Sequence, residues 1–389
     1  MMYPNFNGII GAPSFPTGIP VVGSPLMASV KPKADVTFPL GNNRAISYAA
    51  DHQGCGFWRI HWPESIINGQ QMGIISNNNF MILQESFYSG IKSVRIQRQV
   101  TPAQYQFVKF LRDLSDKTNN FKIYYEIDDV IFAEDIPTYN KAREAFVDPA
   151  IAATATKIMQ LCDAITTPTK YMSGYYTAKT GVKSITIPNY MPKFWMDRYY
   201  SKQKVVDNYE KNKKRPRIGY VGSPTHFNIG NTPGARDDFA DILEVITKTI
   251  KDFKWVIMGG LPAELANYVR EGHIEYRPWA RIYDYPQAYN DLNLNVAIAP
   301  LQNNPFNLAK ANIKYIEAGA FGVPCICQDL EPYKCASMRF NTGAELIDQI
   351  KKLTSDRRRY LTESDNTYKF ASTFWLEDHI HEFAQLYFA

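Results

Sequence analysis

Cysteine is scarce in this chain, and its few thiols are scattered. The 389 residues contain five cysteines: Cys55, Cys162, Cys325, Cys327 and Cys335. No two of them form a Cys-x-x-Cys pair, and no histidine cluster accompanies them at the spacing of a metal site. The sequence therefore argues against a zinc-binding module, and we expect reduced thiols in a cytoplasmic protein.

Apolar runs long enough to span a membrane are also lacking. The start of the chain is apolar, but prolines at positions 4, 13, 16, 20 and 25 interrupt it, and no basic segment precedes it. Because proline breaks a helix, this start is predicted to be neither a signal peptide nor a membrane span. We therefore expect no membrane partner and a location in the cytoplasm.

The excess of one charge is small. Lysine and arginine together number 43 against 38 acidic residues, which gives a formal net charge of +5. Such a charge permits an anionic partner without requiring one. The sequence shows no internal repeat at a fixed short period and no low-complexity tract, and its length suits two domains.

Short strand-like segments alternate with helical segments in both halves of the chain. The strand-like segments of the first half are NFMILQ, SVRIQRQ, FKIYYEIDDVIF, DAITTPT and KSITIPN, with helices predicted at 102–115 and 149–162. Those of the second half are RIGYVGS, KWVIMGG, IEYRPW, LNVAIAPL and VPCICQ, with helices predicted at 237–251, 261–270, 286–292 and from 306 to 321. Alternation of this kind predicts parallel sheets.

The expected fold class is α/β, with two Rossmann-like parallel-sheet domains that face each other across a cleft. The predicted boundaries are 1–200 for the first domain, 201–216 for a linker with a lysine-rich surface helix, 217–370 for the second domain and 371–389 for a final amphipathic helix. Open sheets of this type bind ligands at the carboxyl ends of their strands, so two facing sheets predict a site for two substrates.

The first loop at the carboxyl edge of the second sheet contains Gly222, Ser223 and His226. Glycine and serine let backbone N–H groups approach an anion, and a helix N-terminus is expected to follow. His226 is a candidate donor to a phosphate. A simple tight turn and an exposed histidine are the alternatives.

A row of charges occupies the predicted helix that starts at Phe306. Lys310, Lys314 and Glu317 stand at i, i+4 and i+7, which places them on one face. The helix follows a buried strand, so its first turn is expected at the ligand edge, where a lysine suits a diphosphate and a glutamate suits ribose hydroxyls. The alternative is a solvated face with a Lys314–Glu317 pair.

Three acidic residues end a strand of the first half: Glu126, Asp128 and Asp129. Acids in such a place are unfavourable unless they are solvated, paired or functional. One aspartate is a candidate general base and another a structural group, such as a helix cap. Metal binding is a further alternative.

The stretch DHQGCGFWRIHWP supplies the candidate acceptor-binding residues Gly56, Trp58 and Arg59. Aromatic and arginine side chains can stack on a sugar or on an extruded base. Arg95, Arg98 and the basic run 211–217 would suit a phosphate backbone. The alternatives are tryptophans in the core and a solvated basic surface.

The segment NLAKANIKYIEAGAFGVPCI resembles the nucleotide-sugar helix of GT-B glycosyltransferases, especially family four. Glu317 matches the second glutamate of the family motif, which binds the nucleotide ribose, and Gly322 and Pro324 match the turn that follows. The first glutamate of the motif is replaced by Ala309. The segment instead resembles a branch with Lys-x-Asn-x-Lys, here Lys310, Asn312 and Lys314.

Other segments extend the resemblance over most of residues 50–385. GYVGSPTH is similar to the phosphate loop of the same domain, and DAITTPTKYM with ITIPNYMP is similar to the end of the first domain. The tail around Trp375 resembles the helix that crosses back to that domain. The implied fold is GT-B. A glycine-rich turn early in the first domain also resembles the family's acceptor loop.

The resemblance implies a glycosyltransferase that uses a UDP-sugar as co-substrate, with no metal and no other cofactor. Lys310 and the turn at 222–223 would neutralise the diphosphate. The Lys-x-Asn-x-Lys pattern and the EIDD strand also look similar to bacteriophage enzymes that glycosylate hydroxymethylcytosine in double-stranded DNA with arabinose or glucose, which implies a host cytoplasm.

A carbohydrate or protein acceptor, and an inactive DNA-binding or scaffold protein in view of Ala309, are the alternatives. The stereochemistry of transfer and the oligomeric state stay open.

Overall fold

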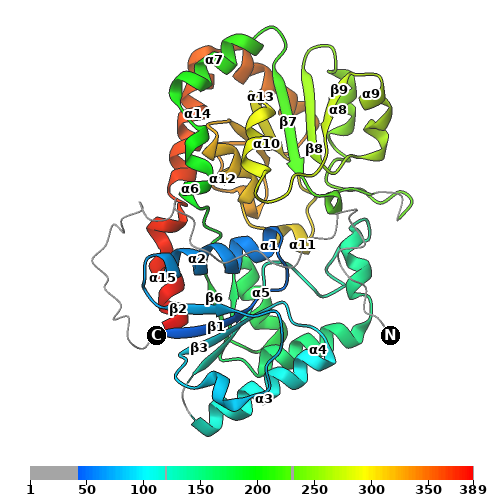
Figure 1. Ribbon diagram of the computed structural model, residues 1–389. Coiled ribbons are helices and arrows are strands. Elements are labelled where there is room, and N and C mark those ends of the chain that lie inside the picture. The colour runs from blue at the N-terminus through cyan, green and yellow to red at the C-terminus, as the bar shows by residue number, and fades with distance from the viewer. Residues whose placement is uncertain (1–42, 119–120, 229–231, 389) are drawn as a thin grey trace.

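The computed structural model describes residues 43–118, 121–228 and 232–388. The prediction for the proline-interrupted start of the chain lies outside these residues. Two domains, each built on one sheet, are stacked in Figure 1, and the C-terminal helix lies beside the first. Within the described ranges, no helix combines the length and the hydropathy that crossing a membrane requires.

The first domain contains a six-stranded sheet in the order β2-β1-β3-β4-β5-β6, and all neighbouring strands are parallel. Its strands are β1 (Arg44–Tyr48), β2 (Ile74–Asn77), β3 (Ser93–Gln97), β4 (Lys122–Glu126), β5 (Ala164–Thr167) and β6 (Ser184–Thr186). The sequence did not reveal β1. The predicted strand NFMILQ is wrong, because the strand is the preceding segment IISN, and Phe80, Met81 and Leu83 are exposed.

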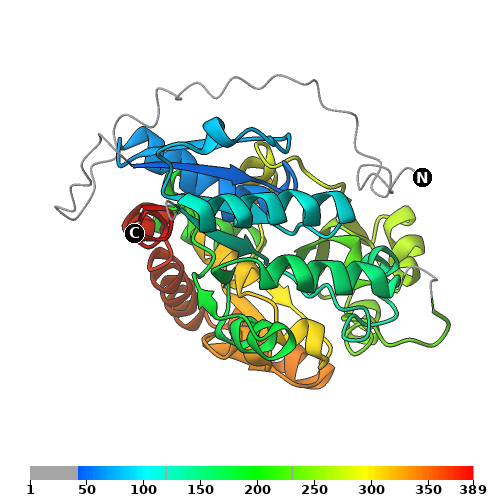
Figure 2. The same cartoon turned by 90° about the horizontal axis from the view of Figure 1, so that it is seen from below.

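Helices cover both faces of this sheet. They are α1 (Gly54–Gly56), α2 (Trp62–Gly69), α3 (Pro102–Thr118), α4 (Pro149–Gln160) and α5 (Lys170–Thr180), and a π-helical turn (Phe57–His61) joins α1 to α2. Helix α3 buries Phe107, Val108, Leu111 and Leu114, the i, i+1, i+4 and i+7 positions of an amphipathic helix. Helices α3 and α4 pack together across the lower face of the domain in Figure 2.

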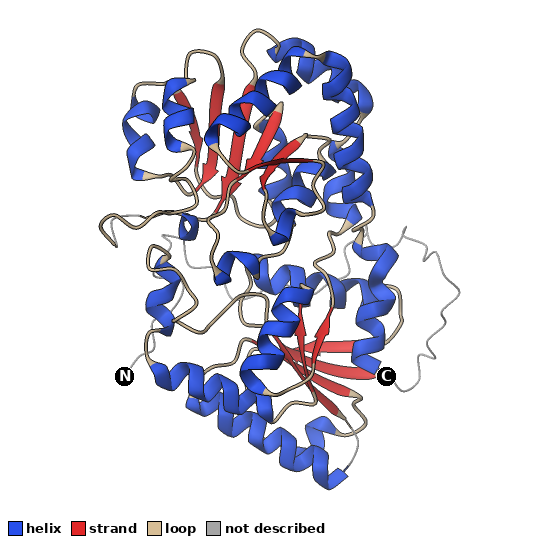
Figure 3. Ribbon diagram, turned by 180° about the vertical axis from the view of Figure 1, so that it is seen from behind, coloured by secondary structure: helices blue, strands red, loops and turns tan. Residues whose placement is uncertain are grey.

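The second domain has a parallel sheet in the order β12-β11-β10-β7-β8-β9. Its strands are β7 (Arg217–Gly222), β8 (Lys254–Gly259), β9 (Ile274–Arg277), β10 (Val296–Ala299), β11 (Cys325–Gln328) and β12 (Met338–Phe340). The helices around it are α8 (Leu243–Lys248), α9 (Ala266–Arg270), α10 (Tyr285–Asp291), α11 (Pro305–Leu308), α12 (Ile313–Ala320), α13 (Gly343–Ser355) and α14 (Arg357–Ser372). Figure 3 shows both sheets between their helices, and the predicted α/β fold is confirmed.

The helix predicted at 237–251 is shorter in the structure. Helix α8 covers Leu243–Lys248, and turns precede it. The carboxylate of Asp237 accepts hydrogen bonds from the backbone N–H groups of Phe239 and Asn228, at 2.9 and 2.8 Å. Aspartate that bonds nearby backbone in this way competes with helix formation, which delays the start of α8.

Between the two sheets, the chain forms α6 (Lys193–Met196) and α7 (Lys202–Asn212). The predicted linker 201–216 therefore contains a helix. Val205 and Tyr209 of α7 are buried in the core of the second domain, where Tyr209 packs against Tyr360 of α14.

The last helix, α15 (Leu376–Phe388), packs against α2, β1 and β3 of the first domain. The Ser93 hydroxyl donates to the carbonyl of Tyr387 at 2.7 Å. The chain thus crosses between the domains twice, and the two crossings are joined: Met191 N–H donates to Phe374 O at 2.8 Å, and Leu376 N–H donates to Met191 O at 2.9 Å. The predicted final helix, 371–389, spans the end of α14 and all of α15.

Candidate functional site

Each sheet has a point at which its strand order reverses. In the second sheet this point lies between β7 and β10, and in the first it lies between β1 and β3. Loops that leave neighbouring strands in opposite directions open a crevice at the carboxyl edge, where doubly wound sheets bind ligands. The loops at these points carry the segments 223–226 and 300–312 in one domain and 49–56 and 98–101 in the other.

The predicted helix from Phe306 is interrupted in the structure. Helix α11 ends at Leu308 and α12 begins at Ile313, so Lys310 lies in the break rather than on a helix face. The Ala309 carbonyl, which a continuous helix would bond to residue 313, accepts instead from the Thr169 hydroxyl of the first domain at 3.3 Å. An interdomain contact therefore occupies a backbone group that the helix would use.

Lys310 makes a second contact between the domains. Its ammonium lies 3.2 Å from both carboxylate oxygens of Asp129, and 4.0 Å from the ring centroid of Phe306. The side chains of Lys310 and Asp129 are 21% and 32% exposed. The ion pair is therefore accessible to solvent, and an anionic ligand could replace Asp129 as the partner of Lys310.

Lys314 points toward His226 from α12. The distance from Lys314 Nζ to His226 Nε2 is 3.3 Å. Burial, together with the positive charge of Lys310, lowers the pKa of Lys314 to about 8. Burial and the charge of Lys314 lower the pKa of His226 to about 4. The imidazole is therefore neutral at pH 7, beside two lysines.

Glu317 lies one turn further along α12. It is 9% exposed, and Tyr285 of α10 donates its hydroxyl to Glu317 Oε2 at 2.8 Å. Burial raises the pKa of Glu317 to about 7, against the opposing effects of Tyr285 and Lys314. In the described part of the chain, Lys314 and Glu317 form no ion pair, so the alternative of a solvated pair is wrong.

The loop after β7 packs closely against the loop after β8. The carbonyl of Gly222 accepts a hydrogen bond from the Gly260 N–H at 2.8 Å, and a Cβ atom on Gly260 would lie 2.7 Å from Pro224, so a side chain does not fit there. The Ser223 hydroxyl bonds that of Thr225 at 2.6 Å. Across the described residues 223–228, the expected helix N-terminus is not formed, and a three-residue 3-10 turn (Pro224–His226) follows the strand instead.

Asn312, the middle residue of the Lys-x-Asn-x-Lys segment, has a contact of its own. Its side-chain amide points to the Cys335 sulfur, 3.6 Å away. The structure therefore brings Lys310, Lys314, Glu317 and His226 together with the loop at 222–223, and directs the side chain of Asn312 to a different neighbour.

The two aspartates after β4 lie in different surroundings. Asp128 is nearly buried, its Oδ1 has no hydrogen-bond partner among the described residues, and burial raises its pKa against the opposing effects of Arg98 and Cys55. Arg98 lies beside it, with Nη2 3.5 Å from Asp128 and 3.3 Å from Asp51. Arg98 has φ of +48°, which is uncommon for a residue with a side chain. Asp129 faces Lys310, and no helix cap is formed at either aspartate.

Arg59 and Arg95 do not face a ligand. Both side chains are fully buried, and both bind Glu126. Arg59 also donates to Ile187 O at 2.6 Å and to Asn189 Oδ1 at 2.9 Å. The prediction that these arginines bind the acceptor is therefore corrected: they neutralise a buried glutamate and join distant segments of the first domain.

Gly56 and Trp58 also have packing roles. A Cβ on Gly56 would lie 1.9 Å from the carbonyl oxygen of Asp51, so the turn requires glycine. Trp58 is 5% exposed, and its ring packs edge-on against Trp62. Of the predicted acceptor residues, Arg98 retains some exposure, and it lies near Asp129, which pairs with Lys310 of the second domain.

The basic run 211–217 lies at the opposite edge of the second sheet. It ends where β7 begins, and the six residues of β7 extend roughly 20 Å to the loop at 222–223. Three of its side chains are engaged locally: Lys213 with Glu210, Arg215 with the Ile250 carbonyl and Arg217 with Glu275. In Figure 1, α7 and the start of β7 lie far from the first domain.

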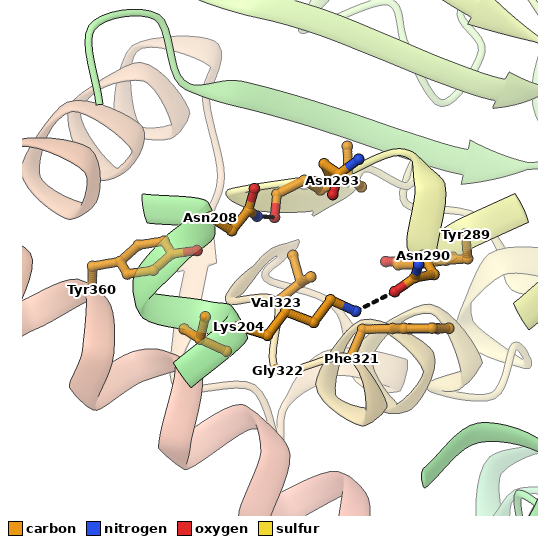
Figure 4. A pocket seen from close by; sticks show the side chains of 11 residues that line it. Lys204, Asn208, Tyr289, Asn290, Asn293, Phe321, Gly322, Val323 and Tyr360 are labelled. Carbon is orange, nitrogen blue, oxygen red and sulfur yellow. Dashed lines mark hydrogen bonds between the residues drawn. The ribbon is translucent and has the colours of Figure 1, made fainter. Parts of the chain in front are cut away.

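A small cavity of about 30 Å³ also lies at this opposite edge, since the residues that precede β10 and β11 line it (Figure 4). The Lys204 ammonium donates to the Tyr199 carbonyl at 2.7 Å and to Asn290. Two of the three N–H donors of the Lys204 ammonium are thus used within the protein, and the cavity is remote from the loops that join the domains.

Three residues of the site were not found from the sequence. Asp238 binds His226, Tyr139 brings its hydroxyl from the first domain to Asp238, and Tyr285 binds Glu317. Asp238 belongs to the acidic pair after His226, which was a usable signal. Tyr139 and Tyr285 are single tyrosines among 25, and no local pattern distinguishes them.

No family model matches the sequence, and no curated protein matches it either. Solved structures resemble the whole fold at low identity. Sucrose-phosphate synthase from Thermosynechococcus elongatus aligns with a TM-score of 0.60 and 12% identity, over 89% of this chain and 98% of that one. Anabaena HepE, solved with UDP and glucose, aligns with a TM-score of 0.55 and 9% identity over 89% and 98%.

TarM aligns with a TM-score of 0.51 and 12% identity, over 78% of this chain and 57% of that one. These proteins have the GT-B architecture of two facing Rossmann-like domains. The chain therefore has the GT-B fold.

Proposed function

We propose that the protein is a glycosyltransferase that takes its sugar from a UDP-sugar. The observation that carries this proposal is the group formed by Lys310, Lys314 and Glu317 at the strand-order reversal of the second sheet. The fold supports it, because HepE shares this fold and was solved with UDP and with UDP-glucose. The two lysines can bind the negatively charged diphosphate, and the glutamate can accept hydrogen bonds from the ribose hydroxyls.

The chemical role of the lysines follows from the leaving group. When the sugar leaves, negative charge develops on the diphosphate, and fixed cations stabilise that charge. Lys310 would exchange Asp129 for a phosphate oxygen, while Lys314 would approach from α12. Glu317, which Tyr285 holds at one oxygen, keeps its other oxygen for a ribose hydroxyl.

We propose different roles for the two aspartates. Asp128 is the better general base, because its raised pKa favours proton uptake and its Oδ1, 3.5 Å from Arg98 Nη2, has no hydrogen-bond partner among the described residues. Asp129 acts as the counter-ion of Lys310 in the free enzyme. Asp128→Asn should leave UDP binding intact and lower turnover by about 10²–10⁴-fold.

Asp129→Asn is the matched comparison, because it removes the neighbouring charge and should lower turnover less. Full activity of both variants would reduce the pair to a structural role. We propose that no metal takes part. Loss of activity with EDTA and its return with manganese would contradict this.

For the acceptor, we propose 5-hydroxymethylcytosine in double-stranded DNA, with arabinose or glucose as the sugar. The support is the similarity of the Lys-x-Asn-x-Lys segment and the EIDD strand to bacteriophage enzymes of this type, together with the net charge of +5. Arg98 and the exposed rings of Trp279 and Tyr283, which follow β9, are the groups available to a base or a phosphate.

The test incubates the protein with candidate UDP-sugars and DNA that contains either cytosine or hydroxymethylcytosine, and mass spectrometry then weighs the nucleosides. A sugar mass found only on the hydroxymethylated base supports the proposed acceptor. Transfer to a carbohydrate or protein, with none to DNA, would select the alternative acceptor. If no nucleoside diphosphate raises the melting temperature and no donor is hydrolysed, the protein is not a glycosyltransferase and a scaffold role gains support.

A further inference from the structure

A single buried carboxylate connects both domains to the lysine of α12. Asp238 is 2% exposed and accepts four hydrogen bonds. Its Oδ1 accepts from the Tyr139 hydroxyl at 2.8 Å, from Asn307 Nδ2 at 2.7 Å and from the Gln302 backbone N–H at 2.8 Å. Its Oδ2 lies 2.6 Å from His226 Nδ1. Three of these hydrogen bonds end on Oδ1, and within the described part of the chain Oδ2 has His226 as its hydrogen-bond partner.

Asp238 determines which ring nitrogen of His226 carries the proton, because its carboxylate contacts His226 Nδ1. The carboxylate of Asp238 is ionised, because the hydrogen bonds from His226, the Gln302 backbone N–H and Tyr139 lower its pKa against the effect of burial. A carboxylate accepts only, so His226 Nδ1 must donate to it. The imidazole is neutral, so its Nε2 then carries a lone pair.

The free lone pair of His226 faces an ammonium group. Lys314 Nζ lies 3.3 Å from Nε2 and has only donors to offer. The contact is favourable for the Nδ1-protonated tautomer alone, because the other tautomer would set an N–H against the ammonium. His226 in this state cannot donate to a phosphate, which corrects the role predicted from the sequence.

We propose that Asp238 is a positioning residue which, through the Nδ1-protonated tautomer of His226, holds the Lys314 ammonium in the orientation that receives the diphosphate of the donor. This inference rests on the proposed function and adds to it a chain of three side chains that ends at the ligand. Tyr139 reaches the same carboxylate from the first domain, so the orientation of Lys314 is also tied to the contact between the domains.

The test compares Asp238→Asn with the wild-type protein. Asparagine has the same shape, but its NH₂ group can face Nδ1 and move the ring proton to Nε2, against Lys314. In protein that carries ¹⁵N-labelled histidine, the wild-type spectrum should show His226 protonated at Nδ1, and the variant should show it protonated at Nε2. Calorimetry should show UDP affinity reduced by about tenfold to a hundredfold.

Two further variants separate positioning from folding. His226→Gln keeps an acceptor for Lys314 and a donor for Asp238, so UDP affinity should stay within a few-fold of the wild type, whereas His226→Leu should lose as much as Asp238→Asn. Asp252→Asn, an exposed aspartate of a distant turn, is the control for the charge change. Equal losses in the Gln and Leu variants would show that His226 only fills space.

The outcomes for the inference and for the proposed function are distinct. Nε2 protonation in the wild type, or unchanged UDP affinity in Asp238→Asn, would overturn the positioning role. Absence of UDP binding by the wild type would overturn the proposed donor and the ligand named in the inference. The tautomer of His226 is measured without ligand, so it decides the link between Asp238 and His226 in either case.

Discussion

At the scale of single residues, burial has displaced the pKa values of charged groups at the domain interface. The pKa of Lys314 is lowered to about 8, that of Glu317 is raised to about 7 and that of His226 is lowered to about 4. Shifts of this kind gather at binding and catalytic sites, although structural networks also produce them. Here they lie within one helix and the loop that faces it, so the pH dependence of ligand binding reports directly on the site.

We expect UDP to bind less tightly as the pH rises through about 8. The protonated form of Lys314 attracts the diphosphate, and its low pKa means that this form is lost in the free protein near pH 8. Binding therefore takes up a proton above this pH. Lys310, Glu317, Asp238 and Cys325 also act on Lys314, and the measured midpoint reports their combined effect.

The measurement is the dissociation constant of UDP between pH 7 and 9.5. Lys314→Arg should remove the decline, because arginine stays protonated over this range. A wild-type constant that does not change with pH would contradict a contact between Lys314 and the diphosphate.

Glu317→Ala should remove roughly 1–3 kcal/mol of the stabilisation that UDP gives, the usual value of a hydrogen bond to a charged group. The physical reason is the loss of the acceptor for a ribose hydroxyl. Thermal shift and calorimetry measure it, with Glu271→Ala at an exposed turn as control. Equal UDP binding by both variants would remove Glu317 from the site.

At the scale of elements, the sequence predicted the repeating units well and their local chemistry less well. The alternation of apolar strands and amphipathic helices depends on neighbouring residues, so β7 to β11 were found. The break between α11 and α12 was not, and the Ala309 carbonyl at that break accepts from Thr169 of the other domain, a contact that no local pattern reveals. The burial of Arg59 was missed for the same reason, since Glu126 lies 67 residues away in the chain.

The buried cluster around Glu126, at the end of β4, can be tested by mutation. Glu126 accepts from Arg59, Arg95 and Thr166, and its side chain is fully buried. Glu126→Ala would leave two buried guanidinium groups without their counter-ion. We expect the free energy of unfolding in urea to fall by about 3–5 kcal/mol.

Glu85→Ala is the matched control, because Glu85 pairs with Lys117 at the surface. Glu85→Ala should lower the free energy of unfolding by less than about 1 kcal/mol. If Glu126→Ala were as mild, solvent or another acid would have to reach the two arginines.

At the scale of the whole molecule, the first domain depends on the last residues of the chain. Phe383 and Tyr387 of α15 are fully buried, and Arg95 lies 5.6 Å from the ring centroid of Phe383. Phe383→Ala should lower the free energy of unfolding by about 3–5 kcal/mol. Hydrogen exchange should show faster opening of β1 and β3 than of the second sheet.

Phe80→Ala is the control of the same chemistry, since Phe80 is 81% exposed. It should change the free energy of unfolding by less than about 0.5 kcal/mol. Equal protection of both sheets in Phe383→Ala would mean that the two domains unfold as one unit.

The paired crossings of the chain between its domains set the geometry of any opening movement. The backbone N–H and carbonyl of Met191 both form hydrogen bonds with the segment 374–376, which returns to the first domain. The Glu377 carboxylate accepts hydrogen bonds from the backbone N–H groups of Lys193 and Phe194 at 2.8 and 3.2 Å. Two tethers fixed to each other resist torsion about the long axis of the molecule, because torsion would shear these bonds. Bending across the pair leaves these hydrogen bonds intact, so an opening that separates Lys310 from Asp129 would hinge at the paired crossings rather than twist there.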